Sequence, residues 1–262
     1  MTFEERIAIV TGASSGIGAA VALDLARRGA RVVAVARRRD RLEAAVERCR
    51  AHSPESVALA ADVSSRAACA EVVEATEARF GRVDMLVNNA GISVHKHAAD
   101  TGADEVEHVM AVNFLGPVHL TMAALPGMLE RAAGSVVNVT SVAGYVPNPG
   151  EAAYGASKAA LSRWSHGLAV DLHGTGVHVG VLSPGPIDTE IWSLDDELSY
   201  HGKLHPPEMV AASVARMIER GLTHQTVPRR YGAVGALYPL LGRPMRWGLR
   251  RYGERSERER AR

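Results

Sequence analysis

A glycine-rich turn near the start of the chain constrains the fold more than any other segment. TGASSGIG occupies residues 11–18, after an apolar run that predicts a buried strand and before a pattern that predicts a helix. In this spacing Gly12 permits a tight turn, Gly16 lets the backbone approach a pyrophosphate, and Gly18 lets the helix pack closely on the strand. The first turn of such a helix also offers unpaired N–H groups to an anion. The segment therefore predicts a dinucleotide-binding unit.

Short β-branched runs alternate with helical patterns along most of the chain. The expected strands are 6–12, 31–37, 56–63, 83–91, 134–141, 176–185 and 224–230, with helices such as 16–29 and 41–51 between them. This alternation is typical of parallel strands joined by right-handed crossovers. We therefore predict an α/β, doubly wound Rossmann fold, with a seven-stranded parallel sheet and helices on both faces.

The same pattern sets the expected domain organisation. Residues 1–230 would form one dinucleotide-binding catalytic domain, and residues 231–262 an apolar and basic C-terminal extension of it. A chain of 262 residues with 47% hydrophobic and 23% charged residues suits one such domain. No run approaches the roughly 20 apolar residues that span a membrane. The acidic pair Glu4 and Glu5 argues against a signal peptide, and two isolated cysteines fit a reducing compartment, so we expect a cytoplasmic protein.

Charge is distributed unevenly, because residues 243–262 hold eight arginines and three glutamates within a chain of net charge +1. No basic stripe with interleaved aromatic residues crosses the rest of the chain, so nucleic-acid binding is not expected. The extension could be a flap over the substrate entrance, a subunit contact or an amphipathic surface anchor. Pro239 and Pro244 would interrupt a long helix, so the extension is a weaker candidate for a membrane anchor.

The end of the second expected strand bears on the choice of dinucleotide. An acid at this position would bind the adenosine ribose, whereas arginine would accept a 2′-phosphate. The chain has Ala36 where the acid would stand, followed directly by Arg37 and Arg38. A solvated charge run is the alternative reading. Basic residues oppose the dipole at a helix N-terminus, however, and an anionic ligand would relieve this, so NADP(H) is favoured over NAD(H).

Tyr154 and Lys158 lie four residues apart in AAYGASKAA (152–160), on one face of an expected helix. A phenol has an ordinary pKa near ~10, and a neighbouring positive charge would lower it. The motifs TGASSGIG, NNAG (88–91), VNFLG around Asn113, Ser141, YGASK and SPG (183–185) follow one another in order on the expected strands. Over roughly residues 5–230 this set closely resembles the single-domain form of the short-chain dehydrogenase/reductase family.

The resemblance implies four catalytic residues. Tyr154 would be the general acid/base that gives a proton to a carbonyl oxygen or takes one from an alcohol. Lys158 would lower the tyrosine pKa towards neutrality and hold the nicotinamide ribose. Ser141 would bind the substrate oxygen, and Asn113 would hold a water that relays protons from the lysine.

The resemblance also implies a set of cofactor contacts, which include Tyr154 and Lys158. The others are Gly12, Ser14, Ser15, Gly16, Ile17, Gly18, Arg37, Arg38, Asp62, Val63, Asn88, Asn89, Ala90, Gly91, Pro184, Gly185, Ile187 and Thr189. Many NADP(H)-dependent relatives carry a basic residue where this chain has Ser15. Because of that difference, the preference for NADP(H) rests on Arg37 and Arg38 alone, and use of NAD(H) stays possible.

The expected activity is the interconversion of a carbonyl and a secondary alcohol on a moderately apolar small molecule. The segment 188–206 corresponds to the family's substrate lid and offers Ile191, Trp192, Leu194, Leu198 and Tyr200, beside His201, Lys203 and His205. HKH (95–97) has no evident third ligand and indicates a loop at the rim rather than a metal site.

The helix after Tyr154 often packs against its copy in this family, so a homodimer or homotetramer is expected. The alternative functions are a non-catalytic nucleotide-binding regulator and a nucleotide-binding transferase. The first can lose the tyrosine or the lysine, whereas both are present here, and the second would leave Ser141, Tyr154 and Lys158 unexplained.

Overall fold

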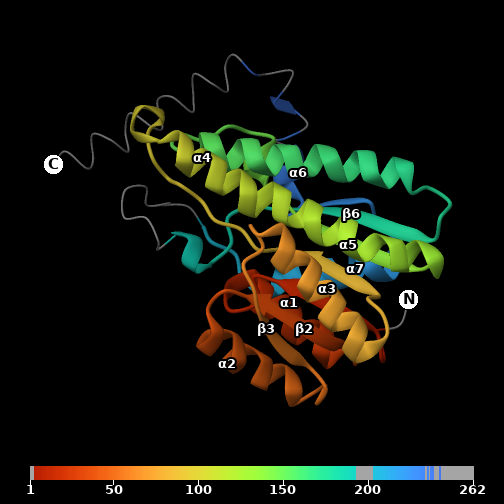
Figure 1. Cartoon of the computed structure of the whole chain (residues 1–262). Helices are drawn as coiled ribbons and strands as arrows, with labels where there is room; N and C mark the ends of the chain where they lie inside the picture. The colour runs from red at the N-terminus through yellow and green to blue at the C-terminus, as the bar shows by residue number, and fades with distance from the viewer. Residues whose placement is uncertain (1–2, 193–202, 234, 236, 239–241, 243–262) are drawn as a thin grey trace.

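One parallel sheet organises the molecule, with strand order β3-β2-β1-β4-β5-β6-β7 (Figure 1). This computed structural model describes residues 3–192, 203–233, 235, 237–238 and 242. The strands are β1 (Ile7–Thr11), β2 (Arg31–Ala36), β3 (Val57–Ala60), β4 (Met85–Asn88), β5 (Gly134–Val139), β6 (Val177–Pro184) and β7 (His224–Val227). All seven expected strands form, and the predicted doubly wound α/β fold is confirmed.

Helices cover both faces of this sheet (Figure 1). They are α1 (Gly16–Arg27), α2 (Arg39–Arg50), α3 (Arg66–Phe80), α4 (Ala103–Met110), α5 (Gly116–Glu130), α6 (Ala152–Asp171) and α7 (Pro207–Arg220). Short turns are η1 (Ala98–Asp100), the π-helical η2 (Ala111–Leu115), η3 (Val142–Gly144) and η4 (Glu190–Trp192).

Alternation along the strands divides the core into two apolar layers. In β1, Ala8 and Val10 face α1, α2 and α7, whereas Ile7 and Ile9 belong to the layer that contains α3 and α5. Successive side chains of a strand point to opposite faces, so a strand buried on both sides reads as a continuous apolar run. This explains why the strands could be recognised from the sequence.

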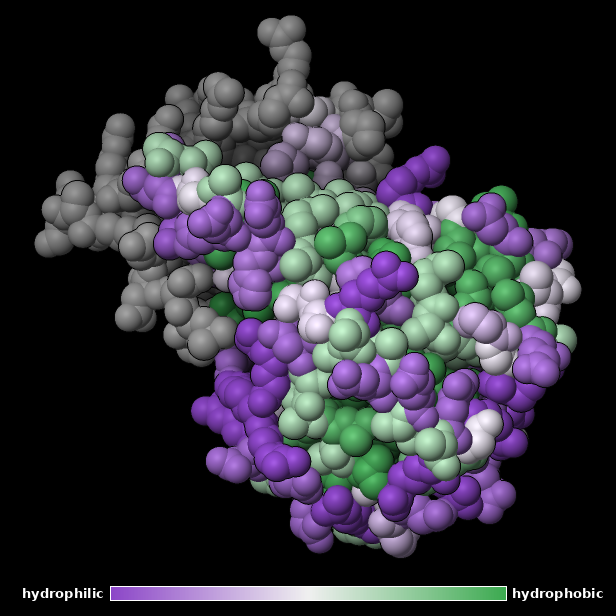
Figure 2. Space-filling model, in the orientation of Figure 1, coloured by the Kyte–Doolittle hydropathy of each residue, from purple (hydrophilic) through white to green (hydrophobic). Residues whose placement is uncertain are grey.

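Residues 103–130 form one helix in which α4, η2 and α5 follow one another without a break. By length and composition it could cross a membrane, yet half of its most apolar window is buried inside the fold. Leu120, Ala124 and Met128 on α5 lie in the core layer beside α3. This packing is that of a core helix. Figure 2 shows hydrophobic surface among polar residues on the face where Figure 1 places α5 and α6.

The topology places a crevice at the carboxyl ends of the strands. β1 pairs with β2 on one side and β4 on the other, so the connections that leave these strand ends diverge. Ligands of open α/β sheets bind at such a switch point. β4 is shorter than the expected 83–91, because the N–H groups of Asn89 and Ala90 leave the sheet and bond to Thr11.

The chain after β7 packs back onto the carboxyl end of the sheet. A Cβ atom on Gly185 would lie 2.8 Å from the ring of Tyr231, and one on Gly235 would lie 3.3 Å from Cβ of Tyr145. The described start of the extension therefore contacts the segments that follow β5 and β6. Residues 243–262, which carry the arginines, lie outside the described part of the chain.

Candidate active site

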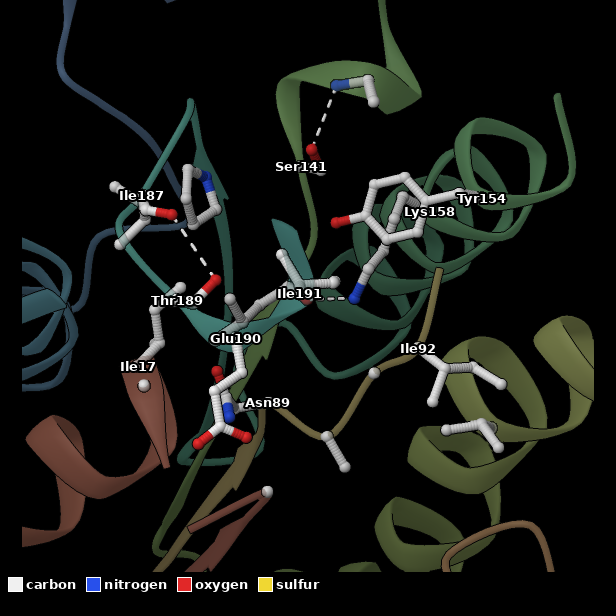
Figure 3. Close-up of a pocket in the computed structure, with 18 of the residues that line it drawn as sticks. Ile17, Asn89, Ile92, Ser141, Tyr154, Lys158, Ile187, Thr189, Glu190 and Ile191 are labelled. Carbon is white, nitrogen blue, oxygen red and sulfur yellow. Dashed lines mark hydrogen bonds between the residues drawn. The ribbon is translucent and has the colours of Figure 1, made fainter. Parts of the chain in front are cut away.

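A cavity of about 910 Å³ lies at the carboxyl ends of β1, β2, β4, β5 and β6. Figure 3 shows that its walls come from segments far apart in the sequence, from Ile17 on α1 to Ile191 on η4. Of the catalytic and cofactor-binding residues expected from the sequence, all line this cavity except Gly18, Asn88 and Asn113. The fold therefore brings the expected set together in one place.

The glycine turn leaves room for a phosphate group beside the first turn of α1. Gly12 and Gly16 have φ angles of +68° and +52°, a region that favours glycine. A Cβ on Gly16 would lie 2.9 Å from Thr189, so a side chain there would narrow the groove. α1 has no acidic residue in its first turn and no side-chain cap, which leaves its N–H groups for an anion. These residues fit a dinucleotide.

Gly18 lies beneath the turn rather than in the cavity wall. A Cβ built on it would lie 2.2 Å from the carbonyl oxygen of Gly12 and 2.6 Å from Nδ2 of Asn89. No side chain could fit between α1 and the end of β1. The close helix–strand approach expected from the sequence is therefore present.

Thr11 holds the NNAG segment in place, a role that sequence reasoning missed. Its Oγ1 accepts the N–H groups of Asn89 at 2.9 Å and Ala90 at 3.0 Å, and donates to the carbonyl of Val87 at 3.4 Å. Nδ2 of Asn89 in turn donates to the carbonyl of Thr11. The only sequence signal for this role was the position of Thr11 directly before Gly12.

The expectation that Asn88 lines the adenosine side is wrong. Asn88 is buried below the cavity floor, where its Nδ2 donates to Asn138 Oδ1 at 2.8 Å and Thr121 Oγ1 at 3.1 Å. Asn88 is the last residue of β4, so its side chain points into the layer covered by α5. Asn89, Ala90 and Gly91 do line the cavity.

Arg37 and Arg38 both line the cavity where β2 ends. Arg38 reaches back to the glycine turn, where its Nη2 donates to Ser15 Oγ at 2.9 Å and to Ser14 Oγ at 3.4 Å. Its Nη1 donates to Glu190 Oε2 at 2.8 Å. Arg38, which belongs to the expected charge run, therefore bonds to the carboxylate of Glu190 on η4. No sequence pattern indicated this contact.

Asp62 and Val63 lie beside this end of the cavity. Burial raises the pKa of Asp62, but hydrogen bonds from the N–H and Oγ of Ser64, together with the charge of Arg37, outweigh burial and lower it. The Asp62 carboxylate is therefore already bonded within its own turn.

Tyr154 and Ser141 face the same space in the cavity (Figure 3). Ser141 follows β5 and accepts the N–H of Ala143 through its Oγ at 3.1 Å, which leaves its O–H as a donor. Burial raises the pKa of Tyr154 well above its usual range, the Ser141 hydroxyl lowers it in part, and the charge of Glu151 raises it. The phenol therefore carries its proton at neutral pH.

Burial, rather than the charge of Lys158, has the largest effect on the pKa of Tyr154 in this structure. The Lys158 ammonium group lies 5.8 Å from the centre of the Tyr154 ring, and it donates to the carbonyl of Val139 at 3.0 Å. The burial that raises the tyrosine pKa also lowers the pKa of Lys158 to about 8. Desolvation is the largest effect on the pKa of each of the two groups.

Asn113 is fully buried in η2, outside the cavity wall. Its Nδ2 donates to the carbonyl of Ile92 and to Ser157 Oγ, and its Oδ1 accepts the N–H of Ile92. A Cβ on Gly91 would lie 3.3 Å from Lys158 Nζ and 3.4 Å from Asn113 Oδ1. The two side chains therefore converge on one small space, and the π-turn, a feature common at functional sites, aims Asn113 at it.

Segments after β6 form the wall opposite Tyr154. Pro184, Gly185, Ile187 and Thr189 all line it, and Ile187 pairs with His205 through the backbone. His205 does not line the cavity as a lid residue would, because its ring is bonded to Arg230 at 2.9 Å. Leu194, Leu198, Tyr200, His201 and the side chain of Trp192 lie outside the described part of the chain.

A polar pair lies at the end of the cavity beside Tyr154. Nε2 of His95 lies 3.3 Å from Oε1 of Glu151, and Asn148 donates to the other carboxylate oxygen at 2.7 Å. The loop with His95 and His97 lines the cavity, as its expected place at the rim implied, but Glu151 was not foreseen. Among the described residues, no three His, Cys, Asp or Glu side chains group as metal ligands would.

The sequence is similar to known dehydrogenases. Residues 6–197 match a family model described as short chain dehydrogenase. A short chain dehydrogenase of Pseudocercospora fijiensis is 41% identical over 196 residues, which are 74% of this chain but only 63% of that protein. An uncharacterized oxidoreductase of Staphylococcus saprophyticus is 34% identical over 80% of this chain and 90% of its own length.

Two solved structures share the fold. A short chain dehydrogenase/reductase from Burkholderia phymatum in complex with NAD matches with a TM-score of 0.85 and 27% identity, over 92% of this chain and 95% of the other. A 3-ketoacyl-(acyl-carrier-protein) reductase from Brucella melitensis complexed with NADH matches with a TM-score of 0.78 and 28% identity, over 87% and 99%.

The Thr11 hydroxyl should contribute measurably to stability. Thr11→Val leaves the N–H groups of Asn89 and Ala90 without their acceptor, at a cost of about 2 kcal/mol. Thr11→Ser keeps the hydroxyl and should cost about 1 kcal/mol for the lost methyl group. Urea denaturation of both variants measures the difference. Equal stability of the two variants would contradict the role given to the hydroxyl.

Burial of Lys158 should make stability depend on pH. The pKa falls from 10.5 to about 8 on folding, so between these values the unfolded chain binds a proton that the folded chain does not. Stability due to Lys158 therefore rises as the pH increases through this window. The free energy of unfolding of the wild type minus that of Lys158→Met should rise between about pH 8 and pH 10.5. Denaturation at a series of pH values checks this, and a flat or falling difference contradicts it.

Proposed function

The chain belongs to the short-chain dehydrogenase/reductase family and is an oxidoreductase, and from this we propose an NADP(H)-dependent enzyme that interconverts a carbonyl and a secondary alcohol. The substrate is a moderately apolar small molecule. One observation carries the proposal: Ser141, Tyr154 and Lys158 meet in the cavity that opens at the glycine turn.

Tyr154 and Ser141 act on the substrate oxygen. The protonated phenol donates its proton to a carbonyl oxygen during reduction, and its phenolate takes a proton from the alcohol in the opposite direction. The Ser141 O–H donates a hydrogen bond to the same oxygen and stabilises the charge that develops there. Because both hydroxyls face one space, a single oxygen atom can contact both.

Lys158 and Asn113 supply the proton path behind Tyr154. The buried ammonium of Lys158 favours the phenolate once the tyrosine has given up its proton. Asn113 Oδ1 has one acceptor position beyond its bond to Ile92, on the side facing Gly91 and Lys158. A water held there would connect the lysine with solvent.

The glycine turn and the segments after β4 and β6 hold the dinucleotide. The first turn of α1 would bind its pyrophosphate. Its adenosine side would contact Asp62, Val63, Asn89, Ala90 and Gly91, and its nicotinamide would be positioned by Pro184, Gly185, Ile187 and Thr189. When bound, the nicotinamide supplies or accepts the hydride. The two similar solved structures hold NAD and NADH, which supports this class of cofactor. Arg37 and Arg38 support the choice of NADP(H).

The described cavity wall suits a substrate with an apolar body and a polar substituent. Its apolar lining beside Tyr154 consists of Ile92, Val142, Ala143 and Ile191. The pair of His95 and Glu151 gives the same end a place for a hydroxyl or another polar substituent. A carbonyl compound with an apolar body therefore suits the site.

The enzyme would work as a homodimer or homotetramer. Large hydrophobic side chains are exposed along the face formed by α4, α5 and α6, among them Met122 and Val170, which are 54% and 75% exposed. Exposed apolar surface of this kind supports the proposal of a subunit contact.

Tyr154→Phe tests the catalytic role, because it removes the proton donor and keeps the ring. Turnover across aliphatic, aromatic and polar carbonyl compounds, followed by the absorbance of the reduced nicotinamide, should fall by about 10²- to 10⁴-fold. Tyr145→Phe is the matched control, since the Tyr145 hydroxyl bonds to Ser162 and Ser183 and Tyr145 is not among the described residues that line the cavity. This control should change turnover little.

Two results would overturn the proposal. Equal turnover by Tyr154→Phe would exclude the tyrosine as the acid. Activity confined to small charged substrates would exclude the apolar substrate class.

Light scattering after gel filtration tests the assembly. The wild type should have the mass of a dimer or tetramer, and Met122→Glu should lower that mass by burying a charge in the contact. Ala51→Glu, at the exposed residue that follows α2, should leave the mass unchanged. A monomeric wild type contradicts the prediction.

A further inference from the structure

Glu190 places a carboxylate among the arginines at the start of α2. Its Oε2 accepts from Arg38 Nη1 at 2.8 Å, and its Oε1 accepts from Arg41 Nη1 at 2.6 Å. Glu190 is the first residue of η4, 152 positions after Arg38 in the chain. Glu190 and Arg38 both line the cavity, so this contact lies within the groove rather than on a remote surface.

The guanidinium of Arg38 is positioned by three side chains. One nitrogen bonds to Ser15 and Ser14 on the glycine turn, and the other bonds to Glu190. Carboxylate and phosphate oxygens use the same donor geometry of arginine. Glu190 therefore accepts a hydrogen bond from an Arg38 N–H group that an anionic group on the cofactor would need.

We propose that Glu190 is a coenzyme-specificity residue, which competes with the 2′-phosphate of NADP(H) for Arg38. The inference rests on the proposed binding of a nicotinamide dinucleotide. NAD(H) carries a 2′-hydroxyl at this position, which has no charge to displace the carboxylate and can donate a hydrogen bond to it. Glu190 thus supplies the acid that the sequence lacks at Ala36, and it narrows the advantage of NADP(H) over NAD(H).

The charges of these groups indicate that Glu190 weakens the binding of NADP(H) but does not prevent it. The hydrogen bond from Arg38 lowers the pKa of Glu190 more than any other interaction, so the side chain is ionised at neutral pH. The Arg38, Arg41 and Glu190 side chains are 44%, 55% and 40% exposed, and solvent weakens their attraction. A phosphate monoester carries a larger negative charge than one carboxylate and can displace it. Arg37, which forms no salt bridge within the described residues, remains available to it.

Glu190→Gln tests the proposal, because it removes the charge and keeps the shape. Dissociation constants of NADPH and NADH are measured from the fluorescence of the reduced nicotinamide at low ionic strength, without substrate. NADPH should bind about tenfold more tightly to the variant, and NADH should change by less than about threefold. Glu47→Gln removes a carboxylate that pairs with Arg50 on α2, outside the cavity wall, and should leave the ratio of the two constants unchanged.

A second variant separates competition from a general charge effect. In an Arg38→Met background the phosphate loses its partner, so Glu190→Gln should no longer tighten NADPH binding. A gain that persists there would overturn the proposal.

The outcomes for the wild type distinguish this inference from the proposed function. If the wild type binds NADPH more tightly than NADH but Glu190→Gln shifts both constants equally, the inference fails and the proposed function stands. If the wild type binds neither dinucleotide, both fail.

Discussion

The close approach of α1 to the end of β1 is the contact on which the site depends. The Cα of Gly18 lies so near the Gly12 carbonyl that no side chain fits between helix and strand. This contact brings the first turn of α1 to the crevice where the connections from β1 and β4 diverge. A larger residue would push the helix away and withdraw its N–H groups from the phosphate position. One pair of glycines therefore fixes the geometry of the cofactor end.

A chain of contacts extends from this turn to Lys158 and Asn113, on the Tyr154 side of the cavity. Thr11 holds Asn89 and Ala90, and Gly91 follows them beside Lys158 and Asn113. Each of these groups has a partner that fixes its direction, which is the condition under which buried polar networks stabilise a fold. The glycine turn and the end of the cavity beside Tyr154 are thus parts of one connected structure.

Local patterns predicted the elements well and the electrostatics poorly. The strands were visible because parallel strands are buried on both faces, and the spacing of Tyr154 and Lys158 placed them on one helix face. The spacing did not indicate that burial would dominate the pKa of Tyr154, or that the Lys158 ammonium would bond to the Val139 carbonyl. Desolvation depends on everything that surrounds a group, and no sequence window contains that information.

The sequence by itself determined the order of strands and helices, the glycine turn and the types of residue at the site. These follow from periodicity and spacing, which act over a few neighbouring residues. Only the tertiary structure decided that Asn88 lies below the floor, that Glu151 faces His95, and that Glu190 meets Arg38. Those contacts join segments brought together by the packing of the whole sheet, and such contacts depend on burial and direction in space.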